Sequence, residues 1–319
     1  MEIENKRIVV TGGAGFLGSR VIEELQSRGC EEIVIPRSEE YDLRNRQAVE
    51  AMYNDADPEV IIHLAGTVGG IGVMSEYSGE IFYDNTKMAL ELIEAGRLHG
   101  LDKFVAIGSV CAYPKHTPVP FKEDMLWEGY PEETHAPYGI AKKLPLVQNS
   151  AYRKQHDFNG IYLLPANLYG PGDDFDLETS HVIPALIRKT DRAMQNSADS
   201  ITAWGTGEPT REFLYVEDAA EAIVEATVKY TKSDPVNLGT GDEISIKRLA
   251  ELIKEKMGFE GEIEWDTSKP DGQPRRCLDV SRARAEFDWT ASTDFEEGIE
   301  QTIEWYRTNR DNILNGEHS

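Results

Sequence analysis

The chain has 319 residues, 40% of them hydrophobic, and its 57 acidic against 33 basic residues give a formal net charge of −24. Because such a surface repels polyanions and anionic lipids at long range, we expect neither nucleic acid nor a membrane as a partner. No apolar run reaches about 18 residues, and no basic start precedes an apolar signal-peptide core. A cytoplasmic globular protein is expected, suited to a salt-rich cytoplasm or to an ordinary mesophilic one.

The cysteine content is low. Cys30, Cys111 and Cys277 are too few and too widely spaced for a disulfide framework or a zinc site, so no metal centre is expected. Each thiol therefore has to be judged singly.

Strand and helix patterns alternate through the first half of the chain. Strands are expected within 6–13, 31–36, 59–66, 103–109 and 160–166, and helices within 16–29, 44–53, 80–99 and 138–156. This alternation predicts an α/β fold, a Rossmann-type doubly wound parallel sheet covered on both faces.

The rhythm changes after residue 168. Loops rich in Gly, Pro and Asp lead to about residue 212, a helix is expected at 215–230, a short strand at 235–239, and further helices at 245–257, 281–286 and 294–308. We expect a cofactor-binding domain of residues 1–168 plus about 213–238, and a smaller, partly interleaved α/β substrate lobe of 169–212 and 239–319. A ligand would lie in the cleft between them.

The stretch TGGAGFLG follows the first strand and opens the first helix, which places Gly12, Gly15 and Gly18 in a Gly-x-x-Gly-x-x-Gly spacing. Glycine allows the tight turn and the close approach of a pyrophosphate, and the helix N-terminus offers free N–H groups to it. Glycine turns also follow strands for purely structural reasons. In this strand-turn-helix context we predict dinucleotide binding.

The choice between NAD and NADP depends on the end of the second strand. An NAD enzyme usually has an acidic side chain there for the ribose 2′-hydroxyl, whereas this chain has Arg37, which suits a 2′-phosphate. The alternative is that Arg37 is a solvated loop charge and that Glu39 or Glu40 contacts the ribose. We predict NADP(H).

Tyr138 and Lys142 lie four residues apart in YGIAK, so both project from one face of the expected helix. Lysine at that distance can favour the phenolate and lower the pKa of the phenol, which would make Tyr138 a usable acid. Ser109, at the end of the fourth strand, is placed to hydrogen-bond a substrate oxygen. This spacing of Tyr and Lys also occurs on helices by chance.

By these features the sequence resembles the extended short-chain dehydrogenase/reductases and, within them, the GDP-L-fucose synthases. The resemblance covers nearly the whole chain, through the motifs TGGAGFLG, HLAGTVGGI (63–71), GSVCAYPK (108–115), YGIAK, PANLYGPGDDF (165–175), SHVIPALIRK (180–189), WGTGEPTREF (204–213) and DTSKPDGQPRR (266–276). The first motif and YGIAK mark only the superfamily, whereas VGGI, SVCAYPK, NLYGPGDDF with SHVIPAL, and KPDGQPR are far more particular.

The resemblance implies an NADPH-dependent oxidoreductase and isomerase acting on GDP-4-keto-6-deoxy-D-mannose. Ser109, Tyr138 and Lys142 match the reductase triad, and Cys111 and His181 match the base and acid that invert carbons 3 and 5. Both carbons flank a keto group that acidifies their hydrogens. A neighbouring positive charge, such as that of His181, would help to ionise the thiol. Cys111 could otherwise be a small buried hydrophobe, and His181 a mere helix cap.

Other matching positions are expected to hold the ligands. The cofactor contacts would be Gly12, Gly15, Phe16, Leu17, Gly18, Arg37, Asp42, Leu64, Ala65, Gly66, Tyr138, Lys142, Pro165, Asn167, Leu168 and His181. The substrate contacts would be Lys189, Trp204, Arg211, Asp271 and Arg276. Arginine suits the diphosphate because its planar fork binds two oxygens. The resemblance also implies a homodimer built on the helices near 80–99 and 138–156.

Two positions depart from the family pattern. Val110 stands where the family commonly has a second hydroxyl residue, which leaves the sugar identity open, and Pro145 should kink or weaken its helix. The nearest alternative is an enzyme that reduces or epimerises a different nucleotide-activated 4-keto sugar. A non-catalytic NADP-binding sensor is a further alternative, but a sensor has no need of the five catalytic side chains together.

Overall fold

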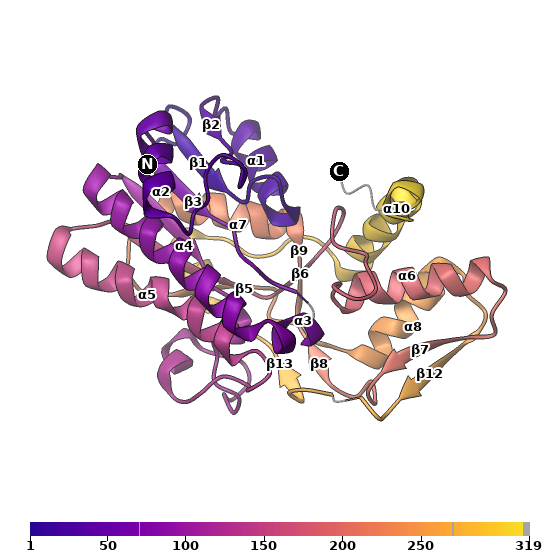
Figure 1. The fold of residues 1–319 in the computed structure, drawn as a ribbon. Coiled ribbons are helices and arrows are strands. Elements are labelled where there is room, and N and C mark those ends of the chain that lie inside the picture. The colour runs from indigo at the N-terminus through magenta and orange to yellow at the C-terminus, as the bar shows by residue number, and fades with distance from the viewer. Residues whose placement is uncertain (70, 270, 315–319) are drawn as a thin grey trace.

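The computed structural model describes residues 1–69, 71–269 and 271–314, which form two lobes (Figure 1). The larger lobe is built on a six-stranded sheet in the order β10-β5-β4-β3-β1-β2, and every neighbouring pair is parallel. Its strands are β1 (Ile8–Thr11), β2 (Ile33–Val34), β3 (Val60–His63), β4 (Lys103–Ile107), β5 (Gly160–Pro165) and β10 (Val236–Leu238). The expected doubly wound fold is confirmed.

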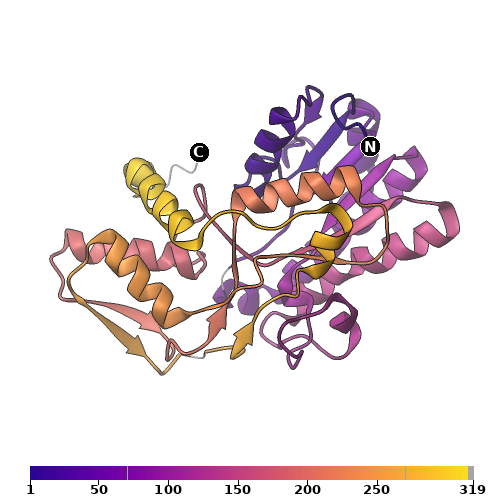
Figure 2. The ribbon, with the colours of Figure 1, turned by 180° about the vertical axis from the view of Figure 1, so that it is seen from behind.

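Helices cover both faces of this sheet, as the two opposite views show (Figures 1 and 2). One face carries α2 (Arg46–Ala56), α4 (Ser78–His99) and α5 (Ala136–His156), and the other carries α1 (Phe16–Ser27) and α7 (Val216–Lys229). Because both faces are covered, β1, β3, β4 and β5 are buried along their whole length. This burial explains why their sequences are continuous apolar runs rather than alternating ones.

The smaller lobe packs α6 (Val182–Gln195), α8 (Ile246–Met257) and α10 (Phe295–Leu314) around a second apolar cluster. Its strands are β7 (Ser200–Trp204) paired with β12 (Glu262–Asp266), and β8 (Thr210–Arg211) between β11 (Ile244–Ser245) and β13 (Arg275–Arg276). Between the lobes, β6 (Asn167–Tyr169) pairs in parallel with β9 (Phe213–Tyr215). The short α3 (Ile71–Glu76) precedes α4.

The expected domain boundaries need one change. The segment 278–289, which the sequence placed in the smaller lobe, carries α9 (Ser281–Phe287) and packs against α7 and β10. Leu278, Ala283, Phe287 and Trp289 belong to the apolar cluster of the larger lobe. The segment belongs to the larger lobe because the apolar face of α9 packs there. The order of elements along the chain does not reveal this packing. The remaining boundaries stay a prediction.

Pro145 does not interrupt its helix, since α5 runs continuously from Ala136 to His156. The proline is buried, so its ring contributes to the packing of α5. Within the residues that the structure describes, no helix has the length and apolarity needed to cross a membrane.

Candidate active site

The glycine-rich turn between β1 and α1 is packed too tightly for side chains. Gly12 has φ +71°, and a Cβ there would lie 2.7 Å from the backbone nitrogen of Ala65. A Cβ on Gly18 would lie 2.1 Å from the carbonyl oxygen of Gly12, so the first turn of α1 rests directly on the loop. Gly15 is the N-cap of α1 and has no side chain in front of the N–H groups of Phe16 and Leu17. The turn thus has the form that a pyrophosphate requires.

The chain after β2 is open to solvent. The Arg37 side chain is exposed, while its carbonyl oxygen accepts hydrogen bonds from the backbone nitrogens of Glu40 and Tyr41. Asp42 forms an ion pair with Arg44, with 2.8 Å between Oδ1 of Asp42 and Nε of Arg44. The guanidinium of Arg44 holds the pKa of this carboxyl below its ordinary value. Arg37 is therefore the accessible cation at this position, as a 2′-phosphate would need.

The carboxyl ends of β3 and β5 border the same side of the sheet. Leu64 and Ala65 follow β3 against Gly12, and a Cβ on Gly66 would lie 3.1 Å from Nζ of Lys142. Pro165 ends β5. Asn167 and Leu168 follow in β6, where Nδ2 of Asn167 donates to the carbonyl oxygen of Glu212 at 2.9 Å.

Ser109, Tyr138 and Lys142 come together. The Ser109 hydroxyl is near enough to the Tyr138 phenol to affect its pKa, and Nζ of Lys142 lies 6.0 Å from the centre of the Tyr138 ring. Burial, with the Cys111 charge adding to it, raises the pKa of Tyr138, against the hydrogen bond from Ser109. Burial lowers the pKa of Lys142 to about 8. The expected lowering of the phenol pKa by Lys142 is therefore wrong for this structure.

Cys111 joins this group through a close contact between two elements. It lies in a short 3₁₀ turn (Val110–Ala112) capped by Ser109, whose Oγ accepts from the Cys111 backbone nitrogen at 3.2 Å. A Cβ on Gly139 would lie 2.3 Å from the Cys111 carbonyl oxygen, so only glycine lets α5 approach this turn. That approach places Tyr138 and Cys111 in one site.

The Cys111 thiol is half-buried among positive charge. Nη1 of Arg276 lies 3.9 Å from its sulfur, and Nη2 of the same guanidinium lies 2.9 Å from Nε2 of His135. Burial alone would raise the pKa of Cys111, but the His135 hydrogen bond, the charges of Arg276 and His135 and the Ser109 hydrogen bond outweigh it and lower the pKa to about 6. A thiol in this setting is largely ionised at neutral pH.

Two expected substrate arginines face the same site. Arg211 in β8 is directly paired with Arg276 in β13. Burial, supported by the nearby Arg276, lowers the pKa of Arg211 to about 10, while Asp271 and Cys111 oppose the shift. Nη2 of Arg211 donates to the carbonyl oxygen of Asp271 at 3.2 Å.

The other expected substrate residues form a neighbouring group. The Trp204 side chain is 61% exposed, with Nζ of Lys189 5.6 Å and Nζ of Lys269 5.2 Å from its ring centre. Asp271 accepts hydrogen bonds from the backbone nitrogen and hydroxyl of Thr206, at 2.7 and 2.8 Å, in the loop after Trp204. An exposed aromatic face ringed by lysines suits a base or sugar bearing phosphate.

His181 is the N-cap of α6 and its side chain is exposed. Desolvation by the surrounding protein lowers its pKa, while Asp174 opposes the shift. The positive charge beside Cys111 that the sequence attributed to His181 comes instead from Arg276 and His135 among the described residues.

Sequence reasoning missed His135 and its neighbour Glu132. His135 is the N-cap of α5 and stands three residues before Tyr138, and its Nδ1 lies 3.1 Å from Oε2 of Glu132. The position of a histidine one turn before the tyrosine was the available signal.

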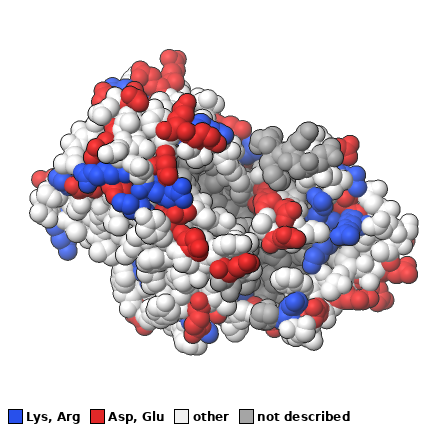
Figure 3. Space-filling model, viewed as in Figure 1, with Lys and Arg blue, Asp and Glu red and all other residues white. Residues whose placement is uncertain are grey.

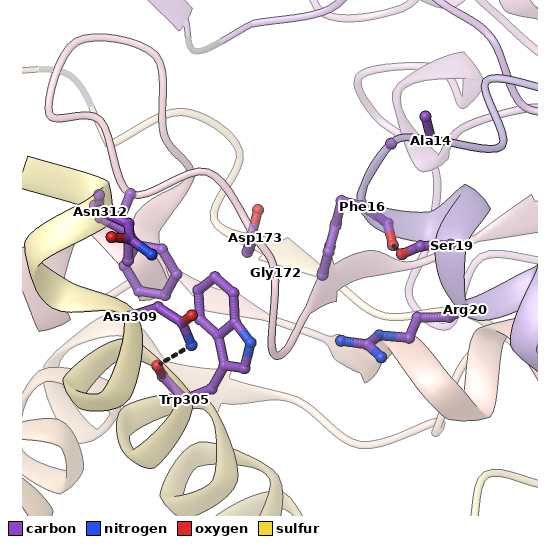
Figure 4. Close-up of a pocket in the computed structure, with 12 residues that line it drawn as sticks. Ala14, Phe16, Ser19, Arg20, Gly172, Asp173, Trp305, Asn309 and Asn312 are labelled. Carbon is purple, nitrogen blue, oxygen red and sulfur yellow. Dashed lines mark hydrogen bonds between the residues drawn. The ribbon is translucent and has the colours of Figure 1, made fainter. Parts of the chain in front are cut away.

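A pocket of about 260 Å³ adjoins the glycine-rich turn, which contributes Ala14, Gly15 and Phe16 to its lining. Figure 4 shows Phe16 and Arg20 of α1 facing Trp305 and Asn309 of α10, with Asp173 between them. Burial raises the pKa of Asp173 to about 7, although the backbone N–H of Asp174 opposes this. Two expected cofactor residues, Gly15 and Phe16, line this pocket.

The surface carries the charge that the composition indicates. On the face of Figure 3, acidic side chains are scattered over both lobes, and basic ones gather in smaller groups.

The fold and this cluster define a dinucleotide-binding enzyme with a serine, tyrosine and lysine site. The model of the "NAD dependent epimerase/dehydratase family" matches residues 8–239, and the chain belongs to that family. It is 40% identical over 306 residues to a putative GDP-L-fucose synthase 2 of Arabidopsis thaliana, covering 96% of this chain and 93% of the relative.

Solved structures agree with this assignment. A GDP-L-fucose synthetase of Naegleria fowleri bound to NADP is 29% identical, with a TM-score of 0.86 over 95% of this chain and 94% of that one. A GDP-mannoheptose C4 reductase of Campylobacter jejuni with NADP bound is 28% identical, with a TM-score of 0.85 over 95% and 99%.

Proposed function

We propose that this protein is an NADPH-dependent enzyme that epimerises GDP-4-keto-6-deoxy-D-mannose at carbons 3 and 5 and reduces carbon 4, which yields GDP-L-fucose. The observation that carries the proposal is the meeting of Ser109, Cys111 and Tyr138 at one point. One group of side chains could then both remove a proton from the carbons beside the ketone and protonate the ketone oxygen during its reduction. The full-length similarity to GDP-L-fucose synthases supports the same conclusion.

The residues present fit the cofactor. The turn at Gly12 and Gly18 leaves no room for a Cβ, and Arg37 is exposed after β2. Gly12, Gly15 and the N–H groups of Phe16 and Leu17 would hold the pyrophosphate, and Arg37 the 2′-phosphate. NADPH, when bound, supplies the hydride for carbon 4.

For the reduction, the protein provides an acid and a positive charge. Tyr138 stays protonated at neutral pH because burial raises its pKa. It would therefore donate its proton to the oxygen on carbon 4 while Ser109 orients that oxygen. Lys142, buried between Gly66 and Tyr138, would hold the ribose and supply positive charge.

For the epimerisation, the Cys111 thiolate would remove the proton from carbon 3 or carbon 5. His181, exposed at the start of α6, would deliver a proton from the opposite face of the ring. Arg211 and Arg276 would bind the diphosphate, with Lys189, Trp204 and Asp271 at the nucleotide end.

The proposal is tested by incubating the purified protein with NADPH and GDP-4-keto-6-deoxy-D-mannose in D₂O. We expect oxidation of NADPH, formation of GDP-L-fucose and deuterium at carbons 3 and 5 of the product. Cofactor binding without turnover of any keto sugar would instead indicate a sensor.

A second candidate is the reduction of another GDP-linked 4-keto sugar. The similarity to a heptose C4 reductase and the apolar Val110 beside Ser109 favour keeping it. Comparing turnover of GDP-linked keto-hexose and keto-heptose substrates, and of dTDP- and UDP-linked ones, separates the two. Reduction without deuterium incorporation would support this second candidate.

We also propose a homodimer that acts in the cytoplasm and packs through α4 and α5. The outer face of α4 exposes Phe82, Tyr83 and Leu90, and α5 exposes Val147. Nε2 of Gln148 joins the two helices by donating to the carbonyl oxygen of Leu90. Apolar side chains gathered on two adjacent helices are typical of a surface that a second copy covers.

A further inference from the structure

Gln273 is a buried side chain that joins the segments carrying Arg276 and Cys111. We propose that Gln273 is a positioning residue that holds the guanidinium of Arg276 against the Cys111 thiol. The catalytic consequence, a thiol kept ready as the epimerisation base, rests on the proposed function, whereas the positioning itself does not.

The two hydrogen bonds of Gln273 fix the orientation of its amide. Oε1 accepts from Nε of Arg276 at 2.6 Å, and Nε2 donates to the carbonyl oxygen of Lys115 at 2.5 Å. Because arginine nitrogens only donate and a carbonyl oxygen only accepts, the amide cannot be turned round. Lys115 stands four residues after Cys111, on the chain that leaves the Cys111 turn. One side chain therefore links the guanidinium to the segment that carries the thiol.

The backbone of Arg276 is held without the help of Gln273. Its strand, β13, pairs with β8, and the backbone nitrogen of Glu212 donates to the carbonyl oxygen of Arg276 at 3.1 Å. Oε2 of the buried Glu212 also accepts from the backbone nitrogen of Leu278 at 2.6 Å. Because these contacts fix the strand, the freedom that remains to Arg276 lies in its side chain.

The guanidinium of Arg276 has contacts at each of its three nitrogens. Nε contacts Gln273, and Nη2 lies 2.9 Å from Nε2 of His135. Since a guanidinium is rigid and planar, these two contacts determine where Nη1 lies. Nη1 is thereby placed 3.9 Å from the Cys111 sulfur, within the hydrogen-bonding reach of sulfur. A guanidinium keeps its charge at every working pH and favours the thiolate form of a cysteine beside it.

Other groups also face the thiol and would remain when Gln273 is replaced. They are Ser109 in the same turn, His135 and Tyr138 at the start of α5, and Arg211 in β8. Tyr138 is uncharged at neutral pH because burial raises its pKa, and Arg211 adds a second positive charge. A displaced Arg276 should therefore weaken the ionisation of the thiol without abolishing it.

The test is the pH dependence of Cys111 alkylation by iodoacetamide in the full-length protein, with each cysteine peptide followed by mass spectrometry. Cys30 and Cys277 are buried and burial raises their pKa values, so they serve as internal references. We expect a midpoint near 6 for Cys111 in the wild type.

Gln273→Leu nearly keeps the size of the side chain and removes both hydrogen bonds. We expect the midpoint to rise by about 1 pH unit, the lower end of what one adjacent charge contributes, which would slow alkylation at pH 6 by about fivefold. Gln273→Asn keeps the amide but is one methylene too short to span both partners. It should shift the midpoint in the same direction, and it replaces Gln273→Leu if that variant does not fold. An unchanged midpoint in both variants overturns the proposal.

Arg276→Met shows whether Gln273 acts through Arg276. Alone, this variant should raise the midpoint by about 1–3 pH units, because it removes the charge next to the thiol. Adding Gln273→Leu to Arg276→Met should then produce no further rise, whereas two independent effects would add. Equal shifts from Gln273→Leu in the presence and in the absence of Arg276 would overturn the positioning role.

Gln301→Leu is the matched control. Gln301 likewise accepts one hydrogen bond, from the Tyr215 hydroxyl at 2.5 Å, and donates one, to Oε1 of Glu297 at 3.2 Å. Its partners lie on β9 and α10, so the alkylation profile should equal that of the wild type. A shift as large as that of Gln273→Leu would count against the proposal. Thermal unfolding and NADPH binding, measured on every variant, report whether the fold is intact.

Deuterium incorporation links the positioning to the proposed reaction. At saturating substrate, Gln273→Leu should exchange less deuterium at carbons 3 and 5 at pH 6 and should recover as the pH rises above its own midpoint. Loss at every pH would contradict the role of Gln273. If the wild type exchanges no deuterium, the proposed function fails, and the alkylation midpoints still decide whether Gln273 holds Arg276 against the thiol.

Discussion

At the scale of single residues, the site separates two kinds of proton transfer by giving two side chains opposite environments. Tyr138 is kept protonated, because burial and the adjacent Cys111 raise its pKa. Cys111 is kept ionised, because His135 and Arg276 outweigh its burial. An acid and a base can therefore share one small site at one pH.

The two roles can be separated by substitution. Cys111→Ser should abolish deuterium incorporation at carbons 3 and 5 and retain at least part of the NADPH oxidation, because the serine hydroxyl is not ionised. Tyr138→Phe should retain the exchange and slow NADPH oxidation by roughly 10²–10⁴-fold, the usual size of general acid catalysis. Both readouts come from one reaction in D₂O. Equal loss of both steps in either variant would contradict the assigned roles.

At the scale of elements, the joint between β1 and α1 depends on the absence of side chains. Gly18→Ala puts a methyl group 2.1 Å from the carbonyl oxygen of Gly12, which forces α1 away from the turn. We expect weaker NADPH binding by fluorescence titration and a stability loss of about 1–3 kcal/mol in denaturant unfolding.

Gly79→Ala, in the first turn of α4, is the control for that substitution. A Cβ there meets nothing within 4 Å, so stability should be unchanged or raised by up to about 1 kcal/mol. NADPH binding equal in Gly18→Ala and Gly79→Ala would show that the turn tolerates a side chain.

The loop between β6 and α6 carries a buried acid whose titration should be visible in the stability. The pKa of Asp173 is raised to about 7 by burial, so the folded state holds this proton more tightly than the unfolded chain does. Stability from this group is full below the unfolded pKa of 3.8 and is lost as the pH rises through about 7. The thermal unfolding temperature should therefore fall more steeply between pH 5 and pH 8 in the wild type than in Asp173→Asn. Parallel curves for the two proteins would contradict this.

At the scale of the whole molecule, the exposed apolar face of α4 and α5 predicts self-association. Leu90 is 41% exposed on α4, and Leu90→Glu would bury a charge in a dimer interface. Light scattering after gel filtration should give a dimer for the wild type and a monomer for the variant. Met194→Glu, on α6 of the smaller lobe, should leave the mass unchanged. A monomeric wild type would remove the basis for the dimer.

The acidic surface makes a further prediction for the whole molecule. A net charge of −24 destabilises the compact state by self-repulsion, and salt screens it. Raising KCl from about 0.1 M to about 1 M shortens the Debye length from about 10 Å to about 3 Å and should raise the unfolding temperature. An unfolding temperature that stays constant or falls would mean that self-repulsion does not limit the stability of the folded state.

Local pattern sufficed wherever a property depends on neighbouring residues. The continuous apolar runs of β1, β3, β4 and β5 predicted a parallel sheet, and the spacing of Gly12, Gly15 and Gly18 predicted a tight turn before α1. The four-residue spacing of Tyr138 and Lys142 placed both on one helix face. These properties follow from backbone geometry, which the sequence dictates within one or two turns of chain.

Only the tertiary structure decided which side chains from distant parts of the chain are in contact. Arg276 lies 165 residues along the chain from Cys111. It reaches the thiol because its strand, β13, pairs with β8. His135 joins them because Gly139 lets α5 approach the Cys111 turn, and the same burial that brings these groups together reverses the expected pKa shift of Tyr138. Desolvation and long-range charge depend on the packed environment, and no local spacing in the sequence encodes that environment.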